Sequence, residues 1–188
     1  GQAAVLQLAA AMAAVNLLEV PALTVGVPVL VVQTLQKSDA SLGLVQAVLS
    51  AGGILGGVLA GTVFVRHPIR SGTGLLLTLS GVCAALGLAL RVPTLQFGSI
   101  LVLGAVFMAV AVLFNVWFFA QLQVLVPQAQ LGKTTACLSV LACLTQPIGQ
   151  AAYGSAFQHW AAHPADVLLV AGVLSALVLW LLQTRRTV

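Results

Sequence analysis

Long apolar runs alternate with short polar connections along the whole chain. Apolar runs of about 20 residues have the length that crosses a bilayer as an α-helix. Six such runs can be read, near residues 4–33, 42–65, 72–90, 96–126, 134–158 and 166–183, and the connections between them carry nearly all the charge. The pattern predicts an all-α membrane protein, in which residues 1–188 form a single bundle of six transmembrane helices.

Composition agrees with a membrane protein. Of the 188 residues, 61% are hydrophobic and 5% are charged, whereas a soluble domain has about 25% charged residues. The net charge of +4 does not point to nucleic acid, because basic residues in membrane proteins gather at the cytoplasmic ends of helices. The histidines fall in connections and the three acids lie far apart in the sequence. We therefore expect no enzyme activity, no metal site and no cofactor.

The basic residues divide unequally between the two ends of the predicted helices. One side has five of them and the other side has two, Lys37 and Arg91. The larger group consists of Arg66, Arg70, Lys133, Arg185 and Arg186. The positive-inside rule places the larger group in the cytoplasm. We expect a multi-pass protein of the cell (inner or plasma) membrane with both termini cytoplasmic.

Glu19 is the only acidic residue inside a predicted span. A carboxyl group at bilayer depth is costly and usually faces a cavity, a partner or an ion pathway. Helical spacing places Asn16 on the same face as Glu19, because residues three and four apart are neighbours on a helix. Pro21 follows two residues after Glu19 and predicts a bend there. For Pro21, a kink without function is as good an interpretation as a functional one. For Glu19, we favour a functional role.

Two other predicted spans contain amide side chains at helical spacing. Gln146 and Gln150 share a face of the fifth span, and Asn115 lies near Phe118 on the fourth. The functional interpretation is a moderately polar cavity edged by aromatic rings. The alternative is ordinary hydrogen bonding between helices, worth about 0.6 kcal/mol for each bond.

Glycines repeat every four residues in the second span. Gly53, Gly57 and Gly61 form one such row, and Gly52 and Gly56 form another. Small residues at this spacing allow two membrane helices to approach closely. The rows predict a helix-packing face.

The first and fourth spans share a short pattern. NLLEVPALTVGVP begins at Asn16, NVWFFAQLQVLVP begins at Asn115, and each stretch ends in proline at the same distance. The two spans run in opposite directions across the membrane. Two three-helix units of opposite direction constitute an inverted repeat, which is a transporter architecture.

The fourth and fifth spans with their connection read FNVWFFAQLQVLVPQAQLGKTTACLSVLACLTQPIGQAAYG. This stretch resembles helices ten and eleven of major facilitator superfamily exporters, and the branch most similar to it contains macrolide-efflux and enterobactin-exporter-like permeases. The residues that carry the resemblance are Asn115, Gln123, Pro127, Leu131, Gly132, Lys133, Pro147, Gly149 and Gly154. SLGLVQAVLSAGGILGGVLAG looks like helix eight of the same family.

The resemblance implies that the six spans are helices seven to twelve, the C-terminal half of a twelve-helix transporter. Glu19, Asn16, Asn115 and Phe118 would then lie near the substrate path. Gly132 and Lys133 would belong to a cytoplasmic loop motif, together with Arg66 and Arg70. The connection GTVFVRHPIRSG departs from the family pattern because it lacks the usual aspartate.

We expect a secondary active transporter half that exports an amphipathic small molecule or drug by proton-coupled alternating access. Its expected partners are membrane lipid, the small-molecule substrate, and an N-terminal six-helix half or a second copy, with no nucleic acid. One alternative is a six-helix substrate-binding subunit of a vitamin importer, which would dock through the small residues of Ala9–Ala14. Another is a structural membrane protein without a solute.

Overall fold

The computed structural model describes residues 2–66 and 72–184, and this part of the chain contains helices and no strand. The elements are α1 (Gln2–Ala14), η1 (Val15–Glu19), α2 (Val20–Pro28), η2 (Val29–Thr34), α3 (Asp39–Arg66), α4 (Thr73–Ala89), η3 (Pro93–Leu95), α5 (Gln96–Leu125), α6 (Gln128–His159) and α7 (Pro164–Thr184). The π-helical turns η1 and η2 join α1 and α2 into one continuous helix over residues 2–34, called the first helix below. The turn η3 is a short 3₁₀ segment.

Each of the six apolar runs forms a helix, so the all-helical prediction is confirmed. The largest difference in boundary is at α6, which begins at Gln128 rather than near residue 134. Pro127 immediately precedes it with φ at −56°, a value that the proline ring fixes and that suits a helix start. Gly132 and Lys133 are therefore helical, which corrects their assignment to a loop. The apolar run marks only part of this helix, because its first turns carry polar residues.

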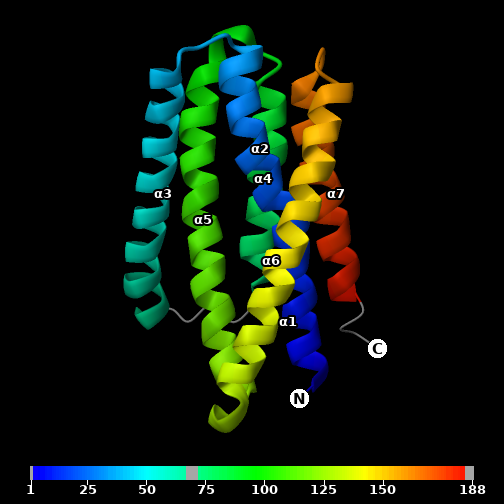
Figure 1. The fold of residues 1–188 in the computed structure, drawn as a ribbon. Helices are drawn as coiled ribbons and strands as arrows, with labels where there is room; N and C mark the ends of the chain where they lie inside the picture. Colours follow the sequence, from blue (N-terminus) through cyan, green and yellow to red (C-terminus); the bar gives the residue numbers. More distant parts are fainter. Residues whose placement is uncertain (1, 67–71, 185–188) are drawn as a thin grey trace.

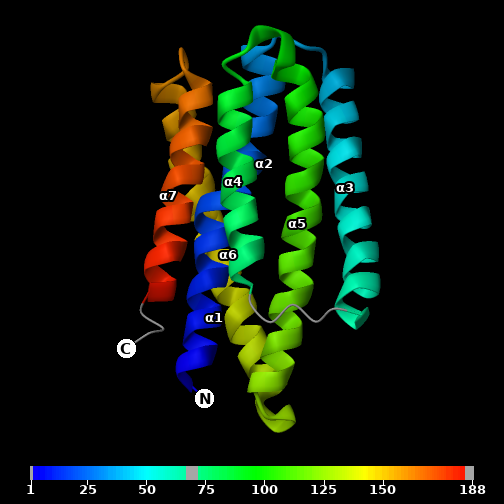
Figure 2. The same ribbon diagram turned by 180° about the vertical axis from the view of Figure 1, so that it is seen from behind.

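The six helices run antiparallel to their neighbours in the sequence (Figures 1 and 2). Both described chain ends, the last turn of α3 and the connection after α5 lie at one end of the bundle, called the terminal end. The connections after η2, α4 and α6 lie at the opposite end, called the distal end. In Figure 1 the first helix, α5 and α6 face the viewer, and α4 and α7 lie behind them. Figure 2 shows α4 and α7 in front.

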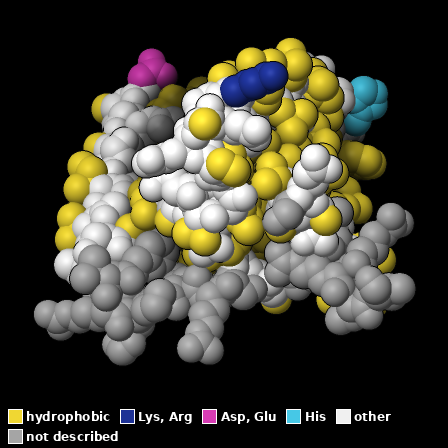
Figure 3. Space-filling view, turned by 90° about the horizontal axis from the view of Figure 1, so that it is seen from below, with side chains coloured by type: hydrophobic (Ala, Val, Ile, Leu, Met, Phe, Trp, Pro, Cys, Tyr) yellow, Lys and Arg dark blue, Asp and Glu magenta, His cyan; other side chains and the backbone are white. Residues whose placement is uncertain are grey.

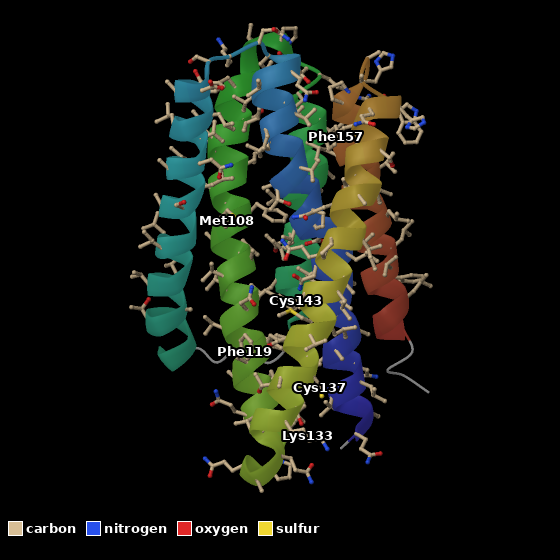
Figure 4. All side chains as sticks on the ribbon, in the orientation of Figure 1. Met108, Phe119, Lys133, Cys137, Cys143 and Phe157 are labelled. Atoms are coloured by element: carbon tan, nitrogen blue, oxygen red, sulfur yellow. The ribbon has the colours of Figure 1, made fainter. Side chains whose placement is uncertain are left out.

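The charged residues follow this division into two ends. Lys133 lies near the start of α6 at the terminal end (Figure 4), and Arg66 is the last residue of α3 at the same end. Arg70, Arg185 and Arg186 lie outside the described residues. Viewed from the terminal end, the described side chains are mostly hydrophobic or uncharged (Figure 3). The two basic residues assigned to the other side, Lys37 and Arg91, lie in the distal connections.

Helix pairs that are distant in the sequence form the bundle. α3 packs along α5, α4 packs along both α7 and α5, and α6 packs against η1 and α2 of the first helix. The largest fully buried side chains include Phe107, Phe114 and Phe118 of α5. Many apolar side chains on the outside are more than half exposed, among them Leu6, Ile54, Val124, Leu144 and Trp180.

Three helical stretches in the described part of the chain have the length and hydropathy to cross a membrane: Gln2–Thr34, Asp39–Thr62 and Pro93–Leu125. Two further apolar helical stretches, Thr73–Ala89 and Pro164–Val178, are shorter. The polar residues of α6 lower its hydropathy below both groups. Three long apolar helices are therefore established, while the number of six spans stays a prediction.

Candidate functional site: a buried carboxyl group at the break in the first helix

Glu19 is buried in the centre of the bundle, with 1% of its surface exposed. Its Oε1 accepts a hydrogen bond of 2.5 Å from the hydroxyl of Ser80 on α4. The hydroxyl of Ser175 on α7 lies 3.0 Å from Ser80 Oγ and donates to it. Both serines are 1% exposed. A polar cluster of Glu19, Ser80 and Ser175 therefore links the first helix to α4 and α7, and it is called the carboxyl–serine cluster below.

The second carboxyl oxygen of Glu19 has no hydrogen-bond partner among the described residues. The one ion pair in the described part of the chain joins Arg91 to Asp166 on the surface. Neither of these residues is part of the cluster. A buried carboxylate without a cation is costly, because its charge has lost water and gained no compensating charge. The cluster therefore suits a carboxyl group that can be neutral.

The backbone at Glu19 departs from an α-helix because of the proline that follows. Pro21 has no N–H, and its ring crowds the carbonyl group of Leu17. The turn before it widens, so that the N–H of Val20 bonds to the carbonyl of Val15, five residues back. A second π-helical turn, η2, begins immediately after Pro28. Pro21 predicted a bend here, and the structure shows a π-helical turn, which places the Glu19 carboxyl on the last residue of a widened turn.

α6 contacts this break through two residues of one helix face. A β-carbon added to Gly149 would overlap the carbonyl oxygen of Leu17 and lie 2.6 Å from Pro21 Cγ. The missing side chain of Gly149 therefore allows α6 to rest directly on the break. One turn later, the hydroxyl of Tyr153 donates a hydrogen bond of 2.6 Å to the carbonyl of Leu18. Side chains commonly bond to the carbonyl groups that a break exposes in membrane helices.

The approach of α7 to α4 brings the two serines together. A β-carbon on Gly172 would lie 2.6 Å from the nitrogen of Ala84 and 2.7 Å from the carbonyl oxygen of Ser80. Gly87 meets α7 in the same way, 2.7 Å from the nitrogen of Leu169. Each serine hydroxyl also has a carbonyl acceptor on its own helix at 3.1 Å, Leu76 for Ser80 and Gly172 for Ser175. The hydroxyl hydrogens of both serines therefore have two possible acceptors.

The other residues predicted for the substrate path do not meet Glu19. Asn16 is half-buried, and its amide donates to the carbonyl of Met12 on its own helix. Asn115 is exposed and donates to the carbonyl of Ala111. Phe118 is fully buried, with Phe119 edge-on at 5.3 Å between ring centroids. In this conformation Phe118 belongs to the apolar core and not to a cavity wall.

The predicted amides of α6 do not bond to the carboxyl–serine cluster. Gln146 and Gln150 are half-buried and have no hydrogen-bond partner among the described residues. They lie three and seven residues after Cys143, which shares their helix face and is exposed. Figure 4 shows Cys143 on α6 and Met108 and Phe119 along α5, in a view in which α4 and α7 lie behind these helices.

The close approach of α3 to α5 occurs at a different glycine row from the one predicted first. A β-carbon on Gly53 or Gly57 would meet only Val112, at 3.7 and 4.0 Å, and one on Gly61 would meet nothing within 4 Å. On Gly52 and Gly56, it would overlap the carbonyl oxygens of Ala105 and Ala109. The packing row is therefore Gly52 and Gly56. The sequence contains both rows at the same spacing, so spacing alone does not distinguish them.

Ser80 and Ser175 were not singled out in the sequence, although a signal for one of them is present. Ser175 is the only hydroxyl, amide or charged residue between Asp166 and Gln183 in an otherwise apolar stretch. Ser80 has Thr78 beside it, and Thr78 is exposed and bonds to its own helix. Only the packing of α4 against α7 reveals that the two serines meet.

Three surface cavities are found elsewhere. One of about 540 Å³ at the distal end is lined by Arg91, His163 and Asp166 among others. It adjoins an apolar groove of about 520 Å³ between α6 and α7, which shares His163 and Asp166. A third, of about 610 Å³, lies at the terminal end beside Gln2 and Pro127. Glu19 and the amides predicted for the substrate path line none of the three.

The chemistry available at the cluster is that of one carboxyl group and two hydroxyls. The described residues hold no group of three His, Cys, Asp or Glu side chains that could bind a metal ion. No protein-family model matches the chain, and searches of curated proteins and of solved structures find no match either. The arrangement of the described residues therefore has to support any functional proposal.

Proposed function

We propose that the chain is a six-helix membrane unit of a secondary active transporter, in which Glu19 binds and releases a proton as the first helix moves against α4 and α7. The observation that carries this proposal is the burial of the only glutamate at the break in the first helix, bonded across to Ser80. A carboxyl group at such a depth usually marks an ion or substrate pathway. Single π-helical turns inside α-helices are frequently found at functional sites.

The contacts between helices support two inverted three-helix units. Under this proposal the first helix, α3 and α4 correspond to α5, α6 and α7. The packing of α3 on α5 then matches that of α6 on the first helix. The contact of α4 with α5 matches that of α7 with the first helix, and α4 and α7 pack on each other. The main contacts are therefore exchanged between the two units, as an inverted repeat requires, whereas the smaller contacts of α6 with α7 and of α4 with η1 have no counterpart of similar size.

The membrane location is part of the same proposal. Exposed leucine, isoleucine and valine side chains cover much of the outer surface, and a soluble protein rarely exposes large contiguous apolar patches. Six spans with both termini on the cytoplasmic side agree with the positions of Lys133 and Arg66 at the terminal end. The basic residues at the distal end are Lys37 and Arg91.

The proposed substrate is an amphipathic or cationic organic molecule, and the proposed partner is a second six-helix unit. Support comes from α5 and α6, where Asn115 is exposed and Gln146 and Gln150 lack partners among the described residues. A second unit over this side would form a moderately polar cavity with these amides in its wall. The major facilitator resemblance places an N-terminal half in that position, and a second copy of this chain is the other candidate.

The vitamin-importer alternative receives less support from the packing. Its docking face would be the small residues of Ala9–Ala14, but Ala9, Ala11 and Ala14 pack against the core of this bundle. Those side chains are therefore already partly used inside the chain.

Transport in vesicles tests the proposal. The protein, with its second six-helix unit, is reconstituted into liposomes, and the movement of ethidium and of protons (reported by a pH dye inside the vesicle) is followed under an imposed pH gradient. We expect Glu19→Gln to abolish proton movement linked to ethidium. The control is Asp39→Asn, which makes the same chemical change at an exposed distal residue. Proton-linked transport by Glu19→Gln at the rate of the control would refute the coupling role.

A further inference from the structure

We infer that the carboxyl–serine cluster is a site for a single proton and not for a metal cation, and that this conformation is its proton-loaded form, with the proton on Glu19 Oε1 and held by Ser80. This inference rests on the proposed function, because it identifies the ion that the Glu19 site binds. Ser80 and Ser175 are then positioning residues, which act on the bound proton through the carboxyl group.

Counting hydrogen atoms shows what an ionised Glu19 would lack. With a carboxylate, Ser80 donates to Oε1 and Ser175 donates to Ser80 Oγ. No described donor remains for Oε2, which is buried. A full negative charge would then have one direct hydrogen bond, with the Ser175 hydroxyl as a second donor close by, and no neighbouring cation. Leaving a buried charged group without partners costs more than leaving a neutral one.

The neutral form satisfies every donor without moving any heavy atom. A proton on Oε1 is donated to Ser80 Oγ across the same 2.5 Å. The Ser80 hydroxyl then turns to the carbonyl of Leu76, and the Ser175 hydroxyl turns to the carbonyl of Gly172, both at 3.1 Å. Oε2 becomes a carbonyl oxygen, the less costly of the two groups to leave without a partner. Because both serine hydroxyls can rotate, the same heavy-atom positions fit Glu19 in its protonated form and in its ionised form.

In this conformation the two oxygens are too close together to hold a metal cation between them. Two oxygens 2.5 Å apart have a hydrogen atom between them, because O–H···O bonds have lengths of about 2.5–3.0 Å. A hard cation such as Ca²⁺ keeps each oxygen ligand at about 2.3–2.6 Å from itself and takes six or more of them. Glu19 Oε1 and Ser80 Oγ would have to separate before a cation could enter. A proton fits the cluster as it stands.

The groups around the cluster leave the proton on Glu19. Cys83 of α4 and Tyr153 of α6 are titratable side chains close enough to interact electrostatically with Glu19. The Cys83 thiol lies 3.6 Å from the carbonyl of Leu168, and the Tyr153 hydroxyl donates to the carbonyl of Leu18. Both therefore have acceptors of their own. No lysine, arginine, histidine or second acid among the described residues contacts Glu19.

Infrared spectroscopy tests the inference, because Glu19 is the only glutamate in the chain. The protein is made by cell-free synthesis with glutamate carrying ¹³C in its side-chain carboxyl, and is placed in lipid nanodiscs. The C=O stretching band of a protonated acid that moves upon ¹³C labelling then belongs to Glu19, without any substitution. We expect this band at neutral pH, with a shift in D₂O and a loss when the pH is raised.

Two variants test the role of Ser80. In Ser80→Ala the Glu19 proton loses its acceptor, so we expect the band to move to higher frequency. Thr78→Val removes a hydroxyl from the exposed side of the same helix, and we expect no change. If Ser80→Ala does not fold, Ser80→Cys leaves sulfur, a weaker acceptor, in the same position, and we expect a smaller shift of the same sign.

Three outcomes would overturn the inference. They are the absence of the labelled acid band at neutral pH, a band that stays unchanged in Ser80→Ala or its substitute, and loss of the band when NaCl replaces choline chloride at constant pH. The measurement does not depend on transport. A normal band combined with undiminished coupling in Glu19→Gln would refute the proposed function, while the proton site would still be supported. An absent band would refute the proton site, even if Glu19→Gln abolishes transport.

Discussion

The two glycine rows of α3 provide a sharp test of how the helices pack. The substitution Gly56→Ala places a methyl group 2.7 Å from the α-carbon of Ala109, where it also overlaps the carbonyl oxygen of that residue. Gly52→Ala places one 2.8 Å from the α-carbon of Ala105. Real β-carbons do not approach other atoms so closely. Because the obstructing atoms belong to the backbone, α5 as a whole has to move away from α3.

The neighbouring row supplies a matched control. In Gly57→Ala the new methyl lies 4.0 Å from Val112, which is an ordinary contact. Alanine is favoured over glycine in a helix by about 1 kcal/mol, and this gain is common to all the substitutions and cancels in the comparison. Overpacking costs about 1–3 kcal/mol. We therefore expect Gly56→Ala to be less stable than Gly57→Ala by about 1–3 kcal/mol.

The assay is reversible unfolding of the purified protein in one detergent, by titration with dodecyl sulfate and far-ultraviolet circular dichroism. The variants Gly52→Ala and Gly53→Ala repeat the comparison one turn earlier. If Gly56→Ala and Gly57→Ala unfold at the same midpoint with the same slope, the assignment of the α3–α5 contact to the Gly52 and Gly56 row is wrong. Greater stability of Gly56→Ala than of Gly57→Ala would refute it more strongly.

Three further predictions concern other contacts. Gly149→Ala forces a methyl group to within 2.6 Å of Pro21 Cγ, so its melting temperature should fall below that of Gly154→Ala, whose methyl meets nothing within 4 Å. Tyr153→Phe removes the hydrogen bond to the Leu18 carbonyl, so the free energy of unfolding should fall by about 0.5–1.5 kcal/mol. Amide exchange in the first helix should become faster, and unchanged exchange would contradict this prediction. Arg91 and Asp166 form an exposed pair, so a double-mutant cycle to alanine should give a coupling below about 1 kcal/mol.

The helices could be predicted from the sequence because each apolar run is long and bounded by charged or turn-forming residues. The prediction at α6 was less accurate, since its helix continues into the polar residues before Thr134. Hydropathy reports where a helix is apolar, whereas backbone hydrogen bonding decides where it begins. The break in the first helix could also be predicted, because Pro21 lacks a donor whatever surrounds it. Its π-helical form could not, because a proline can also be accommodated by a kink in an α-helix.

The partners of Glu19 could not be predicted. A single acid in an apolar run indicates a special environment, but the sequence does not show which helix faces it. Helical spacing suggested Asn16 as a neighbour, yet the π-helical turn changes the angular spacing within residues 15–19, and Asn16 bonds to its own helix. Ser80 and Ser175 lie 61 and 156 positions further along the chain than Glu19. Only tertiary packing brings groups so distant in sequence together.

The position of the cluster constrains how transport would be coupled under the proposed function. Glu19 bonds to Ser80 of α4, and Asn115 of α5 bonds to its own helix, so no amide of α5 or α6 bonds to the carboxyl group. Under the proposed function, a substrate bound by these amides is therefore linked to Glu19 through the protein. The connection available is the break itself, because Gly149 rests on Leu17 and Pro21 between Gln146 and Gln150 in the sequence of α6.

A movement of α6 would act on the first helix through this contact and through the bond from Tyr153 to Leu18. The widened turn ends at Glu19 itself, so a change in its hydrogen bonding turns the carboxyl group relative to Ser80. Breaking the 2.5 Å contact removes the acceptor that holds the proton, and the proton can then leave. Coupling under this proposal is a property of the broken helix and of the packing at Gly149, and it needs no direct meeting of proton and substrate.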